Sequence, residues 1–134
     1  MRIFLFTLAL MLAAPAGADE SITYLVVRNA PLAGFQHHDG KLVWDEMRAG
    51  DALALVREPD NPFDADAVRL EWNGRTVGYV PRLENSDLAR KLDAGLTLEA
   101  RITALAKRRN GRCMISYDIL VPLVTAPVTQ AQGR

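Results

Sequence analysis

Apolar residues follow two different patterns along the chain. Residues 3–14 form a run that is apolar except at Thr7, whereas most later segments alternate apolar and polar residues or hold short apolar groups. Alternation with a period of two is typical of half-buried β-strands, because successive side chains of a strand point to opposite faces. The pattern therefore predicts a mainly β domain that follows an apolar N-terminal segment.

Six later segments have the composition of strands. They are rich in β-branched, aromatic or alternating apolar residues, and turn-forming residues separate them. We expect strands at residues 22–28, 51–57, 67–72, 75–80, 98–104 and 113–121. The alternating apolar positions expected to face the interior in the fifth of these strands are Leu98, Ala100, Ile102 and Ala104. Strands of this number and size suit a small closed or partly open β-barrel, with a β-sandwich as the alternative.

One short helix is expected near residues 85–94. Asn85 or Ser86 can cap its N-terminus, because both side chains accept hydrogen bonds from free backbone N–H groups. Leu88 and Leu92 are spaced to lie on one face of this helix, and Gly95 is expected to end it.

The dipeptide Asn73-Gly74 predicts a tight hairpin between the third and fourth strands. A two-residue type I′ turn favours Asn-Gly because both central residues need a positive φ. Such a turn sets the register outward from itself, so the expected pairs are Trp72 with Arg75, Leu70 with Val77 and Val68 with Tyr79. Tyr79 is thereby expected on the apolar, core-facing side of the hairpin, and Gly78 on the other side. A second Asn-Gly pair, Asn110-Gly111, predicts the turn between the last two strands.

The N-terminal segment, residues 1–18, has the features of a secretory signal peptide. Arg2 gives a positive start, residues 3–14 are the apolar region, and Ala16-Gly17-Ala18 resembles a cleavage site. As a helix the apolar run spans about 18 Å, less than the roughly 30 Å of a bilayer core. We therefore expect cleavage after Ala18 and a periplasmic or secreted protein without a stable membrane span; an uncleaved anchor is the alternative. The expected domain then occupies residues 19–121, and residues 122–134 are expected to form a loose tail.

Charge gives no global signal for a polyanionic partner. The chain has 16 basic and 16 acidic residues, so any polyanion site has to come from local clustering. Basic residues do cluster at the second predicted turn, at Lys107, Arg108, Arg109 and Arg112. This cluster either contacts phosphate groups or is simply a solvated hairpin end. The single cysteine, Cys113, cannot form an intramolecular disulfide, and it alternates in register with the apolar positions of the last strand.

The sequence contains no motif for catalysis, for a cofactor or for a metal ion. It lacks a phosphate-binding loop, a nucleophile elbow and zinc-ligand spacing. Asp60, Asp64 and Asp66 lie around Pro62 without the spacing of a calcium loop, so we interpret them as turn formers. The adjacent residues His37 and His38 point to opposite sides of an extended chain and are not expected to share a metal ion. We therefore expect a non-catalytic binding domain without a cofactor.

The most specific pattern lies between Arg57 and Arg82. The run Pro59-Asp60-Asn61-Pro62-Phe63-Asp64, followed by Ala67-Val68 and by Val77-Gly78-Tyr79-Val80-Pro81-Arg82, resembles the HIRAN domain. The resemblance extends from about Tyr24 to Val121 and implies a small OB-like β-barrel of about six strands. HIRAN domains occur in helicase-like DNA-repair translocases and also alone in bacteria. Those fused to a helicase recognise the 3′ end of single-stranded DNA, which implies that nucleic acid is the partner here.

The resemblance also implies a set of ligand-binding residues. Three of them, Gln36, His37 and His38, stand where the family carries a basic residue and two aromatic residues. The others are Phe63 and Asp64 in the proline-containing loop, Tyr79 as a further lining residue, and Arg82. In such a site, aromatic rings stack on the terminal base, a carboxylate accepts a hydrogen bond from the 3′-hydroxyl, and a cation meets phosphate. The alternative function is an exported module that keeps the barrel but binds another ligand or a protein.

Overall fold

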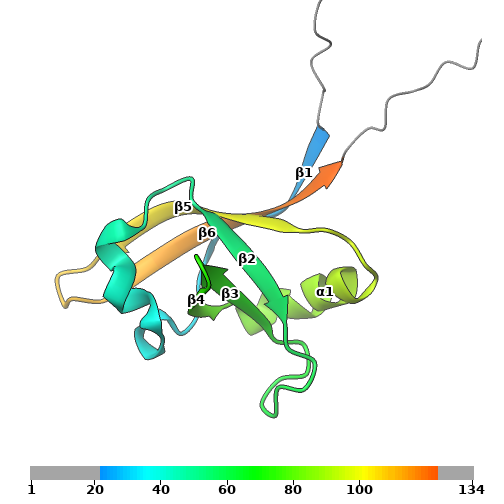
Figure 1. Cartoon of the computed structure of the whole chain (residues 1–134), viewed down its shortest axis with the longest axis horizontal. Coiled ribbons are helices and arrows are strands. Elements are labelled where there is room, and N and C mark those ends of the chain that lie inside the picture. The colour runs from blue at the N-terminus through cyan, green and yellow to red at the C-terminus, as the bar shows by residue number, and fades with distance from the viewer. Residues whose placement is uncertain (1–21, 124–134) are drawn as a thin grey trace, which may run out of the picture.

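The computed structural model describes residues 22–123 of the chain and is mainly β, as predicted (Figure 1). The elements are β1 (Ile22–Pro31), η1 (Phe35–His37), η2 (Asp39–Glu46), β2 (Ala52–Arg57), β3 (Val68–Trp72), β4 (Arg75–Tyr79), α1 (Arg82–Asp93), β5 (Glu99–Lys107) and β6 (Cys113–Leu123). The 3₁₀-helical segments η1 and η2 were not predicted. The predicted signal peptide, residues 1–18, lies outside the described residues and stays a prediction. The predicted tail, residues 122–134, began too early, because β6 includes Pro122 and Leu123. The rest of that tail lies outside the described residues. Within residues 22–123, no helix has the length and apolar character needed to cross a membrane.

The six strands form one antiparallel sheet that closes on itself. Their order is β1-β6-β5-β2-β3-β4, and β2 turns the corner, because its first residues pair with β5 and the rest pair with β3. The first and last strands of this order, β1 and β4, are joined just after β1 ends. There Ala33 and Tyr79, the last residue of β4, exchange two backbone N–H···O hydrogen bonds of 2.9 Å. The result is the small OB-like barrel that the sequence predicts.

The interior of the barrel is filled by the apolar positions of the alternating strands. The largest fully buried side chains are Tyr117, Met47, Leu70, Leu88, Ile102, Ile115, Ile119, Val68 and Val77. Leu88 belongs to α1, so the helix contributes directly to the core. Cys113 is half-buried against the same cluster, in the register predicted for it.

The predicted register of the β3–β4 hairpin is correct only next to its turn. Trp72 pairs with Arg75 as predicted, but Leu70 pairs with Gly78 and Arg69 pairs with Tyr79. Val77 is therefore an extra, bulged residue of β4, and every later side chain of the strand changes face. The prediction that Tyr79 faces the core is wrong. Its side chain lies on the same side as Arg69, outside the barrel.

A second irregularity corrects the prediction for β5. Ala100 and Ile102 are buried as predicted, but the register shifts between Ile102 and Ala104. After this shift Ala104 is exposed, and Leu105 packs against the core in its place. A strict period of two does not predict such a bulge, because the extra residue cannot be recognised from the apolar pattern of the sequence.

Helix α1 begins at Arg82, before the predicted start, and Pro81 is its N-cap. The prediction that Asn85 or Ser86 caps the helix is wrong. Both side chains point from the helix to the proline-containing loop, where Asn85 Nδ2 donates to Asp64 Oδ2 at 2.7 Å and Ser86 Oγ donates to Asp66 Oδ2 at 2.8 Å. The other end is as predicted, with Gly95 at φ +86° just beyond the helix.

Gly78 allows the barrel to close. Its φ is +155°, and a Cβ atom at this position would lie 2.2 Å from Leu32 Cδ2 and 2.3 Å from the carbonyl oxygen of Ala33. The oxygen belongs to the backbone that pairs with Tyr79, so it cannot move away without weakening that pair. Any side chain at residue 78 therefore opposes closure.

We expect Gly78→Ala to lower the free energy of unfolding by about 1–3 kcal/mol through steric overlap, in addition to backbone strain. Urea denaturation followed by tryptophan fluorescence measures the change. Gly74→Ala is the matched control, because Gly74 also has a positive φ, of +79°, but has open space around it. An equal loss of stability in the two variants would contradict the role assigned to close packing at Gly78.

Candidate functional site

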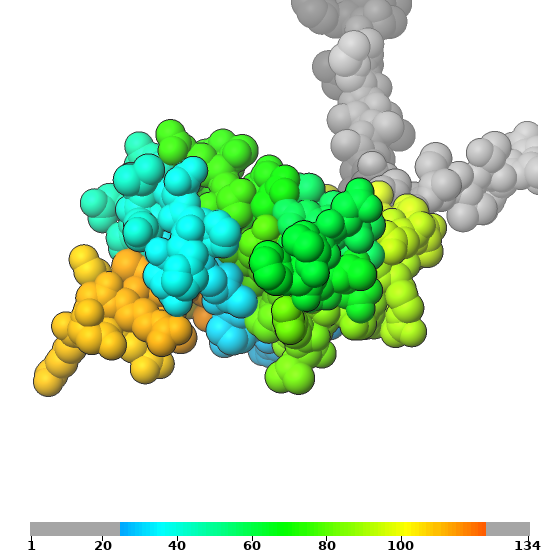
Figure 2. All heavy atoms as spheres, turned by 90° about the horizontal axis from the view of Figure 1, so that it is seen from below, coloured from blue at the N-terminus to red at the C-terminus, as the bar shows by residue number. Residues whose placement is uncertain are grey.

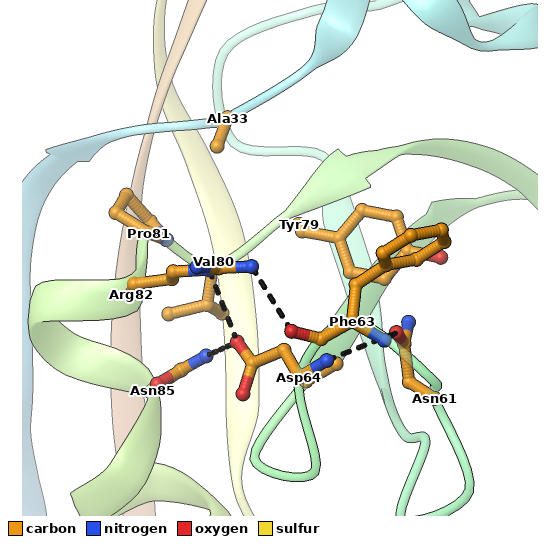
Figure 3. A pocket seen from close by; sticks show the side chains of 10 residues that line it. Ala33, Asn61, Phe63, Asp64, Tyr79, Val80, Pro81, Arg82 and Asn85 are labelled. Atoms are coloured by element: carbon orange, nitrogen blue, oxygen red, sulfur yellow. Dashed lines mark hydrogen bonds and ion pairs between the residues drawn. The ribbon is translucent and has the colours of Figure 1, made fainter.

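A pocket of about 320 Å³ lies between the loop at residues 58–67 and the start of α1 (Figure 3). We call it the proline-loop pocket. Four predicted site residues line it, namely Phe63, Asp64, Tyr79 and Arg82. The remaining lining residues are Ala33, Asn61, Ala67, Val80, Pro81 and Asn85. Its volume is near the lower end of the range for pockets that hold small ligands.

The loop has a defined shape because its polar side chains bind its own backbone. Asn61 Oδ1 accepts hydrogen bonds from the N–H groups of Phe63 at 2.9 Å and Asp64 at 3.2 Å. Asp64 Oδ1 accepts a third from the N–H of Asp66 at 2.9 Å. These are Asx turns, so the turn-forming role predicted for Asp64 is confirmed. The loop thus presents Phe63 and Asp64 from a fixed backbone.

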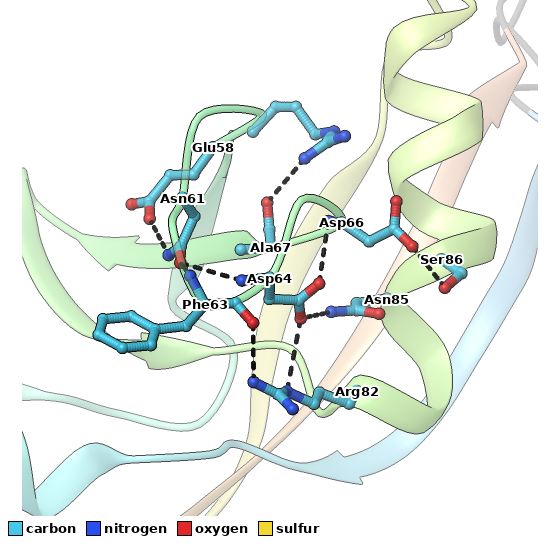
Figure 4. Close-up of polar contacts among 10 residues, drawn as sticks. Glu58, Asn61, Phe63, Asp64, Asp66, Ala67, Arg82, Asn85 and Ser86 are labelled. Atoms are coloured by element: carbon cyan, nitrogen blue, oxygen red, sulfur yellow. Dashed lines mark hydrogen bonds and ion pairs between the residues drawn. The ribbon is translucent and has the colours of Figure 1, made fainter.

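Asp64 is a charged acceptor held in one orientation (Figure 4). The backbone N–H of Asp66 and the amide of Asn85 hold the pKa of the Asp64 carboxyl below its usual value, and the charge of Arg82 adds to this effect. Arg82 Nε lies 3.7 Å from Asp64 Oδ2, and the Asp64 side chain is 22% exposed. A carboxylate has about four acceptor positions, so these contacts leave room for an external donor.

Phe63 and Arg82 form the open side of the pocket. Phe63 is 85% exposed, although its backbone is fixed on both sides. Arg82 Nη2 donates to the carbonyl oxygen of Phe63 at 3.1 Å, and the Arg82 side chain is 75% exposed. The site therefore offers a free aromatic ring and an accessible guanidinium close to the Asp64 carboxylate.

Tyr79 forms a further wall of the pocket and is anchored by Glu58. Its hydroxyl donates to Glu58 Oε1 at 3.0 Å, and the same carboxylate accepts from Asn61 Nδ2 at 3.0 Å and from Arg69. Burial raises the pKa of Tyr79, and the neighbouring Glu58 raises it further, so the phenol stays protonated and remains a donor. Partial burial raises the pKa of Glu58, but the hydrogen bonds from Asn61, Arg69 and Tyr79 outweigh it and leave that pKa below its usual value.

Of the three early-loop residues predicted for the site, only His38 contacts a residue that lines the proline-loop pocket. Its ring lies against that of Tyr79, with centroids 5.5 Å apart and an interplanar angle of 51°. His37 is exposed and does not line the pocket. Gln36 lines a different pocket, together with Lys107.

The predicted basic cluster lies at the tip of the β5–β6 hairpin, outside the proline-loop pocket. Lys107 ends β5, and Arg109 is exposed in the turn. Arg108 directs its Nε toward Met114 Sδ at 3.0 Å. None of the three lines the proline-loop pocket.

Sequence reasoning missed Glu58, Asn61 and Asn85 as site residues. The sequence places Asn61 in the proline-containing motif without a binding role, and it predicts Asn85 only as a possible helix cap. The signal that points to Asn85 is its spacing of three residues from Arg82, which places both on one face of a helix that starts at Arg82. Glu58 carries no such signal, because its contact with Tyr79 depends on the bulge at Val77. Within residues 22–123, no group of three or more His, Cys, Asp or Glu side chains is arranged to hold a metal ion.

Comparisons with known proteins agree with this fold. A family model described as the HIRAN domain matches residues 26–124. A crystal structure of a Lactobacillus plantarum protein is 21% identical with a TM-score of 0.61, covering 75% of this chain and 98% of that one. The crystal structure of the HIRAN domain of human HLTF is also 21% identical, with a TM-score of 0.57 and coverage of 74% and 79% respectively. A search of curated proteins found no match.

Replacing Glu58 by Gln tests the polar anchor of the Tyr79 wall. We expect the free energy of unfolding at about pH 7 to fall by about 1–2 kcal/mol, because hydrogen bonds to a charged acceptor become bonds to a neutral one. The folded-state pKa of Glu58 lies below 4.5, so its contribution is complete above about that pH and is lost as the pH falls through the folded value. The difference between parent and variant should therefore shrink in acid, as measured by urea denaturation across pH.

Glu99→Gln is the control, since Glu99 is exposed on β5. It should change stability by less than about 0.5 kcal/mol at any of these pH values. A Glu58→Gln variant that behaves like this control would show that the anchor does not stabilise the domain.

Proposed function

The chain belongs to the HIRAN domain family, and we propose from this that it is a non-catalytic module that binds a single strand of nucleic acid at its 3′ end. HIRAN is a nucleic-acid-binding domain. The observation that carries the finer proposal is the composition of the proline-loop pocket. An exposed ring, an oriented carboxylate and an accessible guanidinium share one space of about 320 Å³.

The terminal base stacks on Phe63 in this proposal. A ring that is 85% exposed offers a full face to a base, and the fixed backbone limits the ordering cost of binding to the side chain. Stacking is tolerant of sequence because every base has an aromatic face. Tyr79 and His38 provide the further aromatic surface beside it.

The 3′-hydroxyl donates a hydrogen bond to Asp64. This carboxylate stays charged because the N–H of Asp66 and the amide of Asn85 lower its pKa, so it acts only as an acceptor. A hydroxyl fits that requirement, whereas a 3′-phosphate brings negative charge against a carboxylate. Asp64 therefore selects for a free 3′ end.

Arg82 binds the phosphate that links the last two nucleotides. Its guanidinium is 75% exposed and already lies 3.7 Å from Asp64, so one side chain serves both the backbone phosphate and the orientation of the carboxylate. Charge-assisted bonds between arginine and phosphate are stronger than neutral ones and are often bidentate.

The proposed role is binding without catalysis. A general base works best when its pKa lies near the operating pH, and the pKa of Asp64 is shifted away from that range. The hydrogen bonds that keep Asp64 ionised make it a good acceptor and a poor base.

A second candidate function is an exported module that binds a protein or another ligand. Two exposed apolar side chains favour it, because Phe63 is 85% exposed and Leu83, at the start of α1, is 100% exposed. OB-like barrels also bind oligosaccharides and other partners, and this chain has no net charge. Titration with nucleic acid distinguishes the two functions, since only the first predicts a preference for a 3′-hydroxyl.

Asp64→Ala should abolish discrimination between oligonucleotides with a 3′-hydroxyl and a 3′-phosphate. The parent protein should bind the hydroxyl form more tightly across the neutral pH range and lose this preference only in acid, as Asp64 becomes protonated below its usual pKa of 3.8. Fluorescence anisotropy with short 5′-labelled strands at two salt concentrations measures both effects.

Asp60→Ala is the matched control for this experiment. Asp60 belongs to the same loop but lines a different hollow, with Arg57, Glu58, Pro59, Asn61 and Pro62. It should leave the end preference unchanged. Absence of binding by the parent at low salt would exclude the nucleic-acid proposal and leave the second candidate.

Phe63→Ala should weaken binding of single strands by about 1–3 kcal/mol, which is roughly a 5- to 150-fold higher Kd. Stability should not change, because the ring is already exposed to solvent. Leu83→Ala is the control, since Leu83 is exposed nearby but does not line the pocket. Equal affinity of Phe63→Ala and the parent protein would rule out stacking on this ring.

A further inference from the structure

A second pocket, of about 300 Å³, lies between η1, η2 and the β5–β6 hairpin. We call it the hairpin pocket. Its aromatic members are Phe35 and Trp44, whose rings meet edge to face at 5.5 Å. Its charged members are Lys41, Lys107, Arg112 and Asp45, and Gln36, Gly111 and Cys113 complete the lining. Three cations therefore face one carboxylate in a chain whose net charge is zero.

The three cations come from separate segments of the chain. Lys41 lies on η2, Lys107 ends β5, and Arg112 directly precedes β6. Within residues 22–123, all of the ion pairs join other residues, so none of these three cations is in a close ion pair, and they outnumber the one carboxylate of the pocket. Local excess charge of this kind attracts an anion even when the whole molecule is neutral.

The turn that carries Arg112 has a defined backbone. Asn110 Oδ1 accepts a hydrogen bond from the backbone N–H of Arg112 at 3.0 Å. The backbone N–H of Arg108 donates a hydrogen bond to the carbonyl oxygen of Arg112 at 2.8 Å. The N–H of Gly111 donates to the carbonyl of Arg108 at 2.9 Å. Lys107 and Arg112 are thus held on either side of one short turn.

The two pockets are joined by one short stretch of chain. Ala33 lines the proline-loop pocket and Gln36 lines the hairpin pocket, and three peptide units span at most about 11 Å. His38, which contacts Tyr79, follows two residues after Gln36. Figure 2 shows the cyan segment of η1 and η2 between the orange β5–β6 hairpin and the green region that contains the proline loop.

We propose that the hairpin pocket binds phosphodiester groups of the same strand whose 3′ end occupies the proline-loop pocket. This inference rests on the proposed function. The strand runs from Phe63 across His38 toward Lys107 and Arg112, so the binding site covers several nucleotides. The half-buried ring of Trp44 provides an apolar wall for the sugar or base of one of them.

The test compares a dinucleotide with an octanucleotide, both with a free 3′-hydroxyl, by isothermal titration calorimetry on the full chain. In the double variant Lys107→Ala/Arg112→Ala, the octanucleotide should bind at least tenfold more weakly and the dinucleotide should bind as before. Loss of two phosphate contacts should also reduce the slope of log K against log salt by about 1.4 for a single strand.

The matched control is Arg28→Ala/Arg101→Ala. It also removes two cations that line a surface hollow, one formed by β1, β5 and β6 and outside both pockets. This variant should bind both oligonucleotides like the parent. Unchanged dinucleotide binding also shows that a variant is folded.

The outcomes separate this inference from the function on which it rests. Equal losses for the two lengths, or no loss for the octanucleotide, would overturn the proposed path while leaving 3′-end binding intact. If the parent binds neither oligonucleotide, the proposed function itself fails, and the path fails with it.

Discussion

The structure depends on one short backbone contact, the antiparallel pair between Ala33 and Tyr79. This pair joins the two ends of the strand order and turns a six-stranded sheet into a barrel. It forms because Gly78 has no side chain to keep Leu32 and Ala33 away from β4. The same contact fixes the backbone of Tyr79 at the wall of the pocket. The contact that closes the barrel therefore also positions one wall of the site.

A set of polar contacts connects the loop at residues 58–67 to the rest of the domain. Asp64 and Asp66 accept hydrogen bonds from Asn85 and Ser86 of α1, and Glu58 accepts from Tyr79 of β4. Acidic residues that look like a candidate cation site in the sequence thus find their partners within the protein. The arrangement places the loop on two regular elements, which hold a binding site more rigidly than a free loop does.

Local rules were sufficient for most of the fold and for part of the site. The Asn-Gly turns, the strand positions and the end of α1 at Gly95 depend on neighbouring residues and were predicted. The bulge at Val77 was not, because an apolar residue fits the core at residue 77 in either register. Phe63, Asp64 and Arg82 were found through their motif, whereas Glu58 and Asn85 depend on contacts between distant segments. Such contacts leave no periodic trace in a single sequence.

The barrel seam has a consequence for the motions of the domain. The seam consists of a single residue pair, whereas every other junction between strands contains two or more. Regions with few backbone hydrogen bonds open at low free energy without global unfolding. His38 and Tyr79 lie on opposite sides of this seam, and their rings touch across it. A ligand that contacts both rings stabilises the closed form by mass action, so ligand occupancy and slow hydrogen exchange at Ala33 and Tyr79 are thermodynamically linked.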